Sequence, residues 1–159
     1  MTICEVRLQF QNAEQPIALR DKDLIKKIPV IAAAIEVENA NWETTDTIIA
    51  DPIDIPFSRE AGEFLLDNIR KYKMPDNETT VNDYPEADQL SLQELKPIME
   101  LAVFFNCTVF RHAIGFVVVK KLEKESFEDI TRYLGTPVVE PGRYLDEADG
   151  WVNVSEPMP

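Results

Sequence analysis

The spacing of apolar residues changes along the chain, and this change constrains the fold more than any other feature of the sequence. Near the N-terminus, Val6, Leu8 and Phe10 alternate with polar residues, a pattern typical of a strand with one buried face. Residues 12–15 supply a turn and residues 16–19 can return as a second strand. We therefore expect the chain to open with a hairpin.

The middle of the chain alternates short helical and extended patterns. Asp23 can cap a short helix, which Pro29 interrupts before residues 30–35 resume as an alanine-rich helix. Ile53 and Ile55 lie on either side of an aspartate and between two prolines. This arrangement predicts a third short strand at the edge of a sheet.

From residue 58 onward, apolar residues recur with helical spacing. Ser58 begins a helix with one continuous apolar face, made up of Ala61, Phe64, Leu65, Ile69 and Tyr72. Glu94 is predicted to cap the next helix, with Pro97 in its first turn, and residues 109–122 should form a buried helix. The fold class that follows from strands first and helices afterwards is α+β.

The C-terminal part of the chain is predicted to be helical as well. Ser126 and Asp129 have the spacing of a capping box, and Gly135 should end the helix that Ser126 begins. A last short helix would carry Leu145, Ala148, Trp151 and Val152. We expect a first domain over residues 1–122, a helical tail over 123–152 and a disordered C-terminus over 153–159. Within the first domain, residues 73–90 are acidic and contain Pro75 and Pro85, which indicates a mobile surface loop.

Charge and composition exclude several classes of partner. The chain has 16 Lys and Arg against 29 Asp and Glu, a net charge of −13. That charge repels phosphate backbones and anionic lipid headgroups, so we expect neither nucleic acid nor a membrane as partner. The N-terminus lacks the pattern of a signal peptide, and the two cysteines cannot make a disulfide framework. The sequence therefore predicts a cytoplasmic or nuclear protein.

Residue patterns that indicate catalysis are missing from the sequence. The five glycines are isolated from one another, so no glycine-rich phosphate loop is expected. His112 is the only histidine, and it pairs with Cys107 at a spacing that puts the two side chains on different helix faces. We expect both to be buried or half-buried helix residues. The sequence predicts no catalytic residues, no metal and no cofactor, and a hydrolase or transferase stays open as a different class of function.

The order of elements and several short segments resemble a known family. Strand hairpin, short helices, third strand, helix, acidic loop and helical tail together resemble the POZ (BTB) fold. Residues 95–107, LKPIMELAVFFNC, resemble a helix of the S-phase-kinase-associated adaptor of SCF ubiquitin ligases and of its relative elongin C. Residues 126–130 stand where that adaptor family has a Thr-Pro-Glu-Glu-Ile cap, and residues 147–151 resemble its terminal acidic stretch ending in tryptophan. Because elongin C ends after the POZ part, the tail favours the SCF adaptor.

The resemblance implies a non-enzymatic linker that joins a cullin to F-box substrate receptors for ubiquitination. The positions that match the family's cullin contact are Val103, Phe104 and Asn106. Those that match its F-box contact are Val118, Leu122, Phe127, Ile130, Leu134, Leu145 and Trp151. The family's asparagine is replaced by Val103 here. This replacement motivates an alternative, a diverged paralogue that binds F-box-type partners or forms a homodimer through the POZ face without a cullin.

The residues by themselves leave two questions open. The large apolar residues of the tail can either fold back on the chain or form an exposed patch for a partner. Val103 and Phe104 can either pack in the core or contact a partner.

Overall fold

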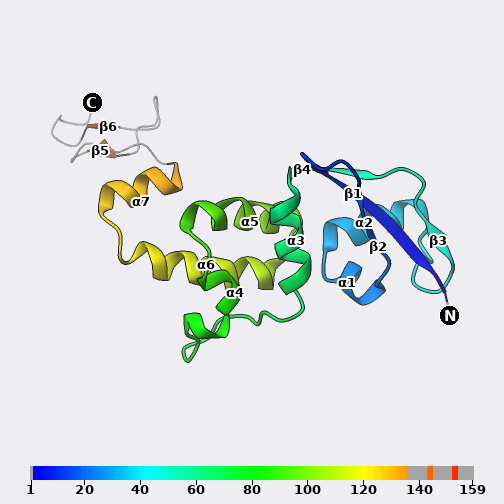
Figure 1. The fold of residues 1–159 in the computed structure, drawn as a ribbon, viewed down its shortest axis with the longest axis horizontal. Helices are drawn as coiled ribbons and strands as arrows, with labels where there is room; N and C mark the ends of the chain where they lie inside the picture. The colour runs from blue at the N-terminus through cyan, green and yellow to red at the C-terminus, as the bar shows by residue number, and fades with distance from the viewer. Residues whose placement is uncertain (1, 136–142, 145–151, 154–159) are drawn as a thin grey trace. The chain divides into compact units, whose positions relative to one another are not determined.

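The computed structural model describes residues 2–135, 143–144 and 152–153, and its fold is α+β (Figure 1). The chain divides into two compact units, residues 1–123 (unit 1) and residues 124–159 (unit 2). The first domain was expected to end at residue 122. Within unit 1, a four-stranded sheet is covered by helices, and we describe each unit by itself.

Strand β1 (Cys4–Gln11) is the centre of the sheet, because every other strand of the sheet pairs with it. β2 (Ile17–Leu19) pairs antiparallel with β1, and the hairpin is confirmed. β3 (Thr47–Ile48) and β4 (Ile53–Ser58) run parallel to β1 and pair with its first and second halves respectively. The sheet was expected to have three strands. β3 was missed because two residues are too short to show a period.

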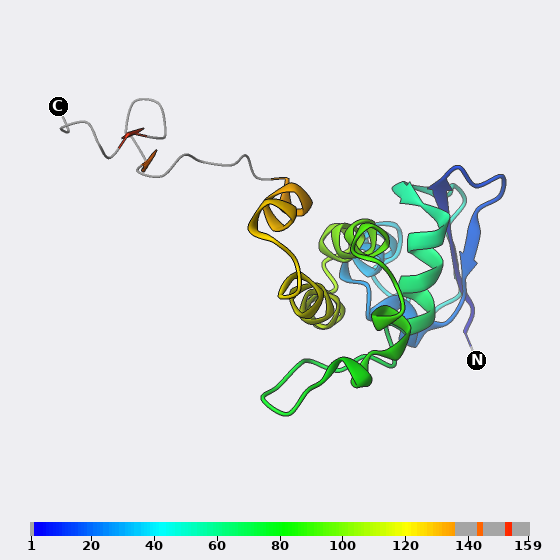
Figure 2. The same ribbon diagram turned by 60° about the vertical axis from the view of Figure 1, so that its left-hand side comes forward.

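The side chains of β1 alternate between two faces of the sheet, as its sequence predicts. Cys4, Val6, Leu8 and Phe10 are buried, whereas the residues between them are half-buried. The buried face is covered by α3 (Arg59–Asn68), which contacts both β1 and β4. α5 (Leu92–Phe104) packs on α3, and α6 (Thr108–Leu122) packs on α5 (Figure 2). The core of unit 1 lies between the sheet and these helices, and Ile25, Ile28, Ile31 and Ile35 from the segment after the hairpin belong to it as well.

Two short helices follow the hairpin, and their first cap differs from the prediction. α1 (Lys22–Lys26) is capped by Asp21 rather than Asp23, because the Asp21 carboxylate accepts the backbone N–H groups of Asp23 and Leu24 at 2.9 and 3.3 Å. Those two bonds, with Arg70 beside the carboxylate, lower the pKa of Asp21. α2 (Pro29–Glu38) begins at Pro29, and the expected break between the two helices is confirmed.

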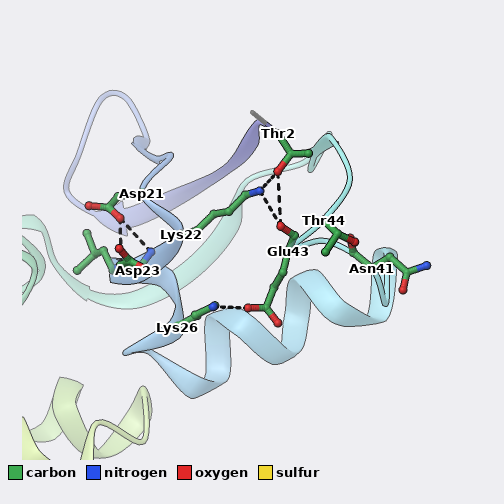
Figure 3. Close-up of polar contacts among 9 residues, drawn as sticks. Thr2, Asp21, Lys22, Asp23, Lys26, Asn41, Glu43 and Thr44 are labelled. Atoms are coloured by element: carbon green, nitrogen blue, oxygen red, sulfur yellow. Dashed lines mark hydrogen bonds and ion pairs between the residues drawn. The ribbon is translucent and has the colours of Figure 1, made fainter.

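Polar contacts attach the chain after α2 to α1 and to the start of β1 (Figure 3). The Lys22 ammonium donates to the Thr2 hydroxyl and, at 3.0 Å, to the Glu43 carbonyl oxygen. The Glu43 carboxylate forms an ion pair with Lys26. At the other end of this segment, the Asn39 amide donates to the hydroxyls of Thr45 and Thr47. These bonds fix the path by which the chain reaches β3.

The acidic segment after α3 is more ordered than its composition predicts, and its description as a mobile loop was wrong for its second half. Val81–Asp83 form the 3-10 helix η1 and Pro85–Asp88 form the short helix α4. Between them Tyr84 is buried, and its hydroxyl donates to the Lys73 carbonyl at 2.6 Å. The Tyr72 hydroxyl accepts the N–H of Ala87 at 3.0 Å, and the two rings meet edge to face with centroids 4.9 Å apart. An aromatic anchor therefore holds this segment against the core.

Helix α5 begins one turn earlier than predicted. Ser91 is its N-cap, and Ser91 and Glu94 form a reciprocal capping box, with each side chain accepting the other residue's N–H at 3.2 and 3.0 Å. Glu94 is therefore the third helical residue rather than the cap, and Pro97 lies inside the helix. α6 agrees with the predicted helix, although Val109 and Val119 are exposed, so that one face rather than the whole circumference is buried.

Unit 2 contains α7 (Phe127–Leu134) and a pair of two-residue strands, β5 (Arg143–Tyr144) and β6 (Val152–Asn153). The Ser126 hydroxyl accepts the N–H of Asp129 at 3.2 Å, and Gly135 ends the helix with a φ of 72°, so both predicted caps are confirmed. β5 and β6 pair antiparallel, which places Val152 in a strand rather than in the predicted last helix. Leu145, Ala148 and Trp151, the other residues of that helix, lie outside the described residues.

Gly62 in α3 and Gly115 in α6 should respond in opposite ways to substitution by alanine. A Cβ at Gly62 would lie 2.4 Å from the ring of Phe10, which is itself buried in the core, whereas a Cβ at Gly115 would meet nothing within 4 Å. We expect Gly62→Ala to lower the free energy of unfolding by about 1–3 kcal/mol through overpacking. Gly115→Ala should raise it by about 0.5–1 kcal/mol through helix propensity. Urea denaturation of both variants measures the difference, and stabilisation by both would contradict the close contact between α3 and β1.

Tyr84→Ala tests whether the acidic segment is part of the core. Because the ring is buried against Tyr72 and Phe116, we expect the variant to lose about 3–5 kcal/mol of unfolding free energy. Asn82→Ala, an exposed position in the same segment, should change it by less than about 0.5 kcal/mol. A Tyr84→Ala protein as stable as Asn82→Ala in urea would mean that the segment is not packed.

Candidate protein-interaction site

The turn between α5 and α6 presents the residues that were predicted to contact a cullin. Phe105 caps α5, and Asn106 follows in the left-handed conformation with a φ of 60°. The Asn106 N–H donates to the Val103 carbonyl at 3.0 Å, and the Cys107 N–H donates to the Ala102 carbonyl at 2.9 Å. These two bonds are the Schellman motif, which favours glycine or asparagine at the left-handed position. Asn106 therefore sets the geometry of this turn.

The turn directs consecutive side chains to opposite sides. Phe105 is fully buried, whereas Val103 and Phe104 are 55% and 41% exposed. The Phe104 ring lies beside Phe57, which follows β4's Pro56, with ring centroids 5.5 Å apart. The result is an exposed apolar surface of Val103, Phe104 and Phe57, which we call the α5-end surface. A partly exposed pair of aromatic rings is the kind of feature that dominates protein interfaces.

The structure brings the three predicted cullin-contact residues together. Val103 and Phe104 lie in the last turn of α5, and the exposed Asn106 lies two residues further on. Of the two alternatives for Val103 and Phe104, the structure shows both side chains on the surface of unit 1 rather than in its core.

The predicted F-box-contact residues fall in different environments. Val118 and Leu122 are buried, with 3% and 9% of their surfaces exposed. Both side chains are covered in the isolated chain, and their part in an F-box contact stays a prediction. On α7, Phe127 and Leu134 are 70% and 55% exposed and Ile130 is half-buried. These three residues, at helical offsets of zero, three and seven, form the apolar face of α7. Leu145 and Trp151 lie outside the described residues.

Sequence reasoning missed two residues of this region. Phe57 contributes to the α5-end surface although it is far from Phe104 in the sequence, and only the packing of α5 on β4 brings the rings together. Val30 is partly exposed, and its N–H lies 3.5 Å from the carbonyl oxygen of Phe105, which joins the start of α2 to the same turn. The local sequence around Phe57 in β4 and around Val30 in α2 has no pattern that indicates either contact.

The candidate nucleophile of the sequence lies in a setting that suppresses its reactivity. Cys107 is buried at the start of α6, and its thiol lies 3.6 Å from the Lys27 carbonyl oxygen. Burial raises the pKa of the thiol to about 12, so the thiolate that would act as nucleophile is scarce at neutral pH. His112 is exposed, contrary to the expectation that it would be buried or half-buried. Within the described residues, no three His, Cys, Asp or Glu side chains are grouped so that they could hold a metal ion.

Two further findings bear on the kind of protein this is. In the part of the chain that the structure describes, no helix has the length and apolarity needed to cross a bilayer. Comparison with known proteins gave no matching family model and no matching curated relative. The class that the fold defines is an α+β domain with exposed apolar side chains at the end of α5, followed by a second unit that contains an amphipathic helix.

The raised pKa of Cys107 should make the stability of the protein fall at alkaline pH. An unfolded thiol loses its proton near pH 8.5, whereas the folded thiol keeps it to about pH 12. The unfolded chain therefore binds fewer protons between these values, and the free energy of unfolding decreases as pH rises through this window. The contribution of the protonated Cys107 thiol to the free energy of unfolding is fully present below about pH 8.5.

Urea denaturation under reducing conditions at about pH 8, 9 and 10 measures this slope. Cys107→Ala is the control, because it removes the thiol and leaves Cys4 and the tyrosines in place. We expect the alkaline slope of wild type to be steeper than that of Cys107→Ala. Parallel pH profiles for the two proteins would show that the Cys107 thiol is as accessible to water in the folded chain as in the unfolded one.

Proposed function

We propose that this protein is a non-enzymatic adaptor of an SCF-type ubiquitin ligase, with a POZ-like unit 1 that binds a cullin and a unit 2 that binds F-box receptors. The observation that carries this proposal is that both units present exposed apolar side chains on helices, at the end of α5 and on α7. Exposed apolar patches of this kind mark interaction sites more often than they mark catalytic ones.

The architecture of unit 1 supports the POZ-like assignment. A hairpin is followed by two short helices, a strand parallel to β1, a helix on the sheet, and a pair of packed helices. This is the order of elements expected from the family that residues 95–107 and 126–130 resemble. The long helices α5 and α6 pack on each other, which gives the end of α5 a rigid base.

The α5-end surface is the proposed cullin contact. Phe104 retains the aromatic residue of the family's cullin contact, and its ring makes a tilted contact with Phe57, with the ring planes at 58°. Val103 replaces a polar group with an apolar one at an exposed position of this turn. We therefore propose a contact that depends on burial of apolar surface rather than on a hydrogen bond at position 103. Each aromatic ring buried in such an interface contributes on the order of 2 kcal/mol.

The apolar face of α7 is the proposed F-box contact. Ser126 and Gly135 fix both ends of this eight-residue helix, so Phe127, Ile130 and Leu134 are aligned before a partner binds. A pre-aligned amphipathic helix interlocks with other helices at a low entropic cost. The proposed role in ubiquitination is geometric: the protein would hold a receptor at a fixed place on the ligase, raising the effective concentration of substrate. Such a role fits the cytoplasm or the nucleus.

A second candidate function is a paralogue that has left the cullin and binds F-box-type partners, or self-associates, through its POZ-like unit. The exposed Val103 favours this alternative, because it replaces the polar residue of the family's cullin contact with an apolar one.

A pair of surface variants separates the two proposed contacts. Phe104→Glu should weaken binding of a cullin N-terminal fragment by about tenfold or more, because it places a charge in an apolar interface. Binding of an F-box peptide should be unchanged. The double variant Phe127→Asp/Leu134→Asp should weaken binding of the F-box peptide and leave binding of the cullin fragment unchanged. Isothermal titration calorimetry with both partners measures each affinity.

Val119→Glu is the matched control, because Val119 is an exposed apolar residue of α6 outside both surfaces. It should leave both affinities unchanged. If wild type binds the F-box peptide but no cullin fragment, the paralogue is the correct assignment. If it binds neither partner, the adaptor proposal is wrong.

A further inference from the structure

A second feature of unit 1, separate from both proposed contacts, is a small groove between α2 and the chain that joins β3 to β4. One wall consists of Ala34, Ile35 and Glu38 of α2, and the other consists of residues 49–51 and Ile53. The groove has a volume of about 230 Å³. This is smaller than the roughly 300–1,000 Å³ of typical small-molecule sites. The groove therefore suits one bulky side chain rather than a cofactor.

Both walls of the groove are fixed by the fold. Ile35 is fully buried, so α2 is anchored on the core beneath the groove. In the opposite wall, the Ile49 N–H donates to the Glu5 carbonyl at 3.0 Å, and the Arg7 guanidinium donates to the Ala50 carbonyl. Ile53 pairs with Leu8 in the sheet. A ligand would meet a groove that is already formed, which reduces the entropic cost of binding.

Exposed aliphatic side chains lie next to the groove in the sequence. Val37, adjacent to Glu38, is 85% exposed, and Ile48, adjacent to Ile49, is 65% exposed. On α2, Ala34, Val37 and Glu38 are three and four residues apart and therefore share one side of the helix. The lining of the groove itself combines aliphatic side chains with the two acids Glu38 and Asp51.

The residues that line the groove include two acids and no base, and the nearby Arg7 guanidinium bonds to the Ala50 carbonyl of the same wall. Residues 28–58 contain six acidic residues and no Lys, Arg or His. Glu43 pairs with Lys26 (Figure 3), and the Asp46 carboxylate accepts the N–H of Ile3 at 2.8 Å. Glu38 and Asp51, the two acids that line the groove, form no ion pair with any described residue. Their carboxylates are available to an incoming cation.

From this combination we propose that the groove binds a short basic segment of a partner protein. One bulky aliphatic side chain of the segment inserts between α2 and residues 49–53, and its flanking Lys or Arg residues pair with Glu38 and Asp51. Charge complementarity selects a basic partner, and the volume of the groove limits the anchor to one side chain. This contact does not depend on the adaptor function, because no residue of the groove belongs to α5 or α7.

The test uses the full chain, labelled with ¹⁵N, and the peptide acetyl-Gly-Lys-Arg-Leu-Arg-Lys-Gly-amide as probe. We expect its addition to shift the amide signals of residues 34–38 and 48–53, with a Kd of about 1 mM or tighter. Replacing the peptide's leucine by alanine should weaken binding about tenfold, because the anchor is lost. No saturable shift in residues 34–38 and 48–53, or equal binding of the alanine peptide, would overturn the proposal.

Charge-matched variants separate a local contact from attraction to an acidic protein. Glu38→Lys/Asp51→Lys should weaken binding about tenfold or more. Asp67→Lys/Glu125→Lys, at two exposed acids outside the groove, changes the net charge equally and should leave the affinity within about twofold. Equal weakening by both pairs would overturn the proposal.

A third variant, Ala34→Trp, fills the groove and keeps its charges, and it should also abolish the shifts while its circular dichroism stays like that of wild type. Binding that survives in folded Ala34→Trp would overturn the proposal. Concentration-dependent shifts of the same residues without peptide would identify the occupant as a second copy of this chain, which also overturns it.

Discussion

The close approach of β1 to α3 is the packing contact on which unit 1 depends. Phe10 of β1 lies so near Gly62 that no side chain can stand between them. This contact sets the distance between the sheet and its first covering helix, and α5 and α6 are stacked on that helix in turn. β1 also carries the sheet, since β2, β3 and β4 all pair with it. A substitution that shifts β1 would therefore change the packing of the sheet and of all three helices stacked on it.

The α5-end surface is a consequence of this stacking and of one backbone conformation. The left-handed Asn106 closes α5 and turns the chain into α6, so that Phe105 enters the core while Val103 and Phe104 stay outside. Because α5 packs on β4, Phe57 near the C-terminal end of β4 comes into contact with Phe104. The surface thus combines a local rule, the left-handed preference of asparagine, with a tertiary contact that has no local signal.

The elements with strong local signals could be predicted from the sequence. The alternation in β1 and the caps at Ser58, Ser126 and Gly135 are all found where the residues indicate them. The two-residue strand β3 could not be predicted, because its pairing depends on the neighbouring strand. The acidic composition of residues 73–90 predicted an exposed segment, yet Tyr84 within it is buried. Average composition cannot show that a single residue of a segment is packed in the core. At the sites, Val103, Phe104, Phe127 and Leu134 are exposed, whereas Val118 and Leu122 are buried. The sequence could not separate the buried from the exposed positions of α6, because apolar residues occur on every side of that helix.

The parallel pairing of β1 with β4 affects the order in which unit 1 assembles during synthesis. Leu8 pairs with Ile53 and Phe10 with Ile55, so β1 leaves the ribosome well before its parallel partner exists. Until then the β1 edge that β3 and β4 later cover is bare, and the apolar face of the hairpin lacks α3, which is the state in which strands pair with the wrong chain. A nascent copy of this protein therefore has an unpaired β1 edge until residues 53–58 have been made.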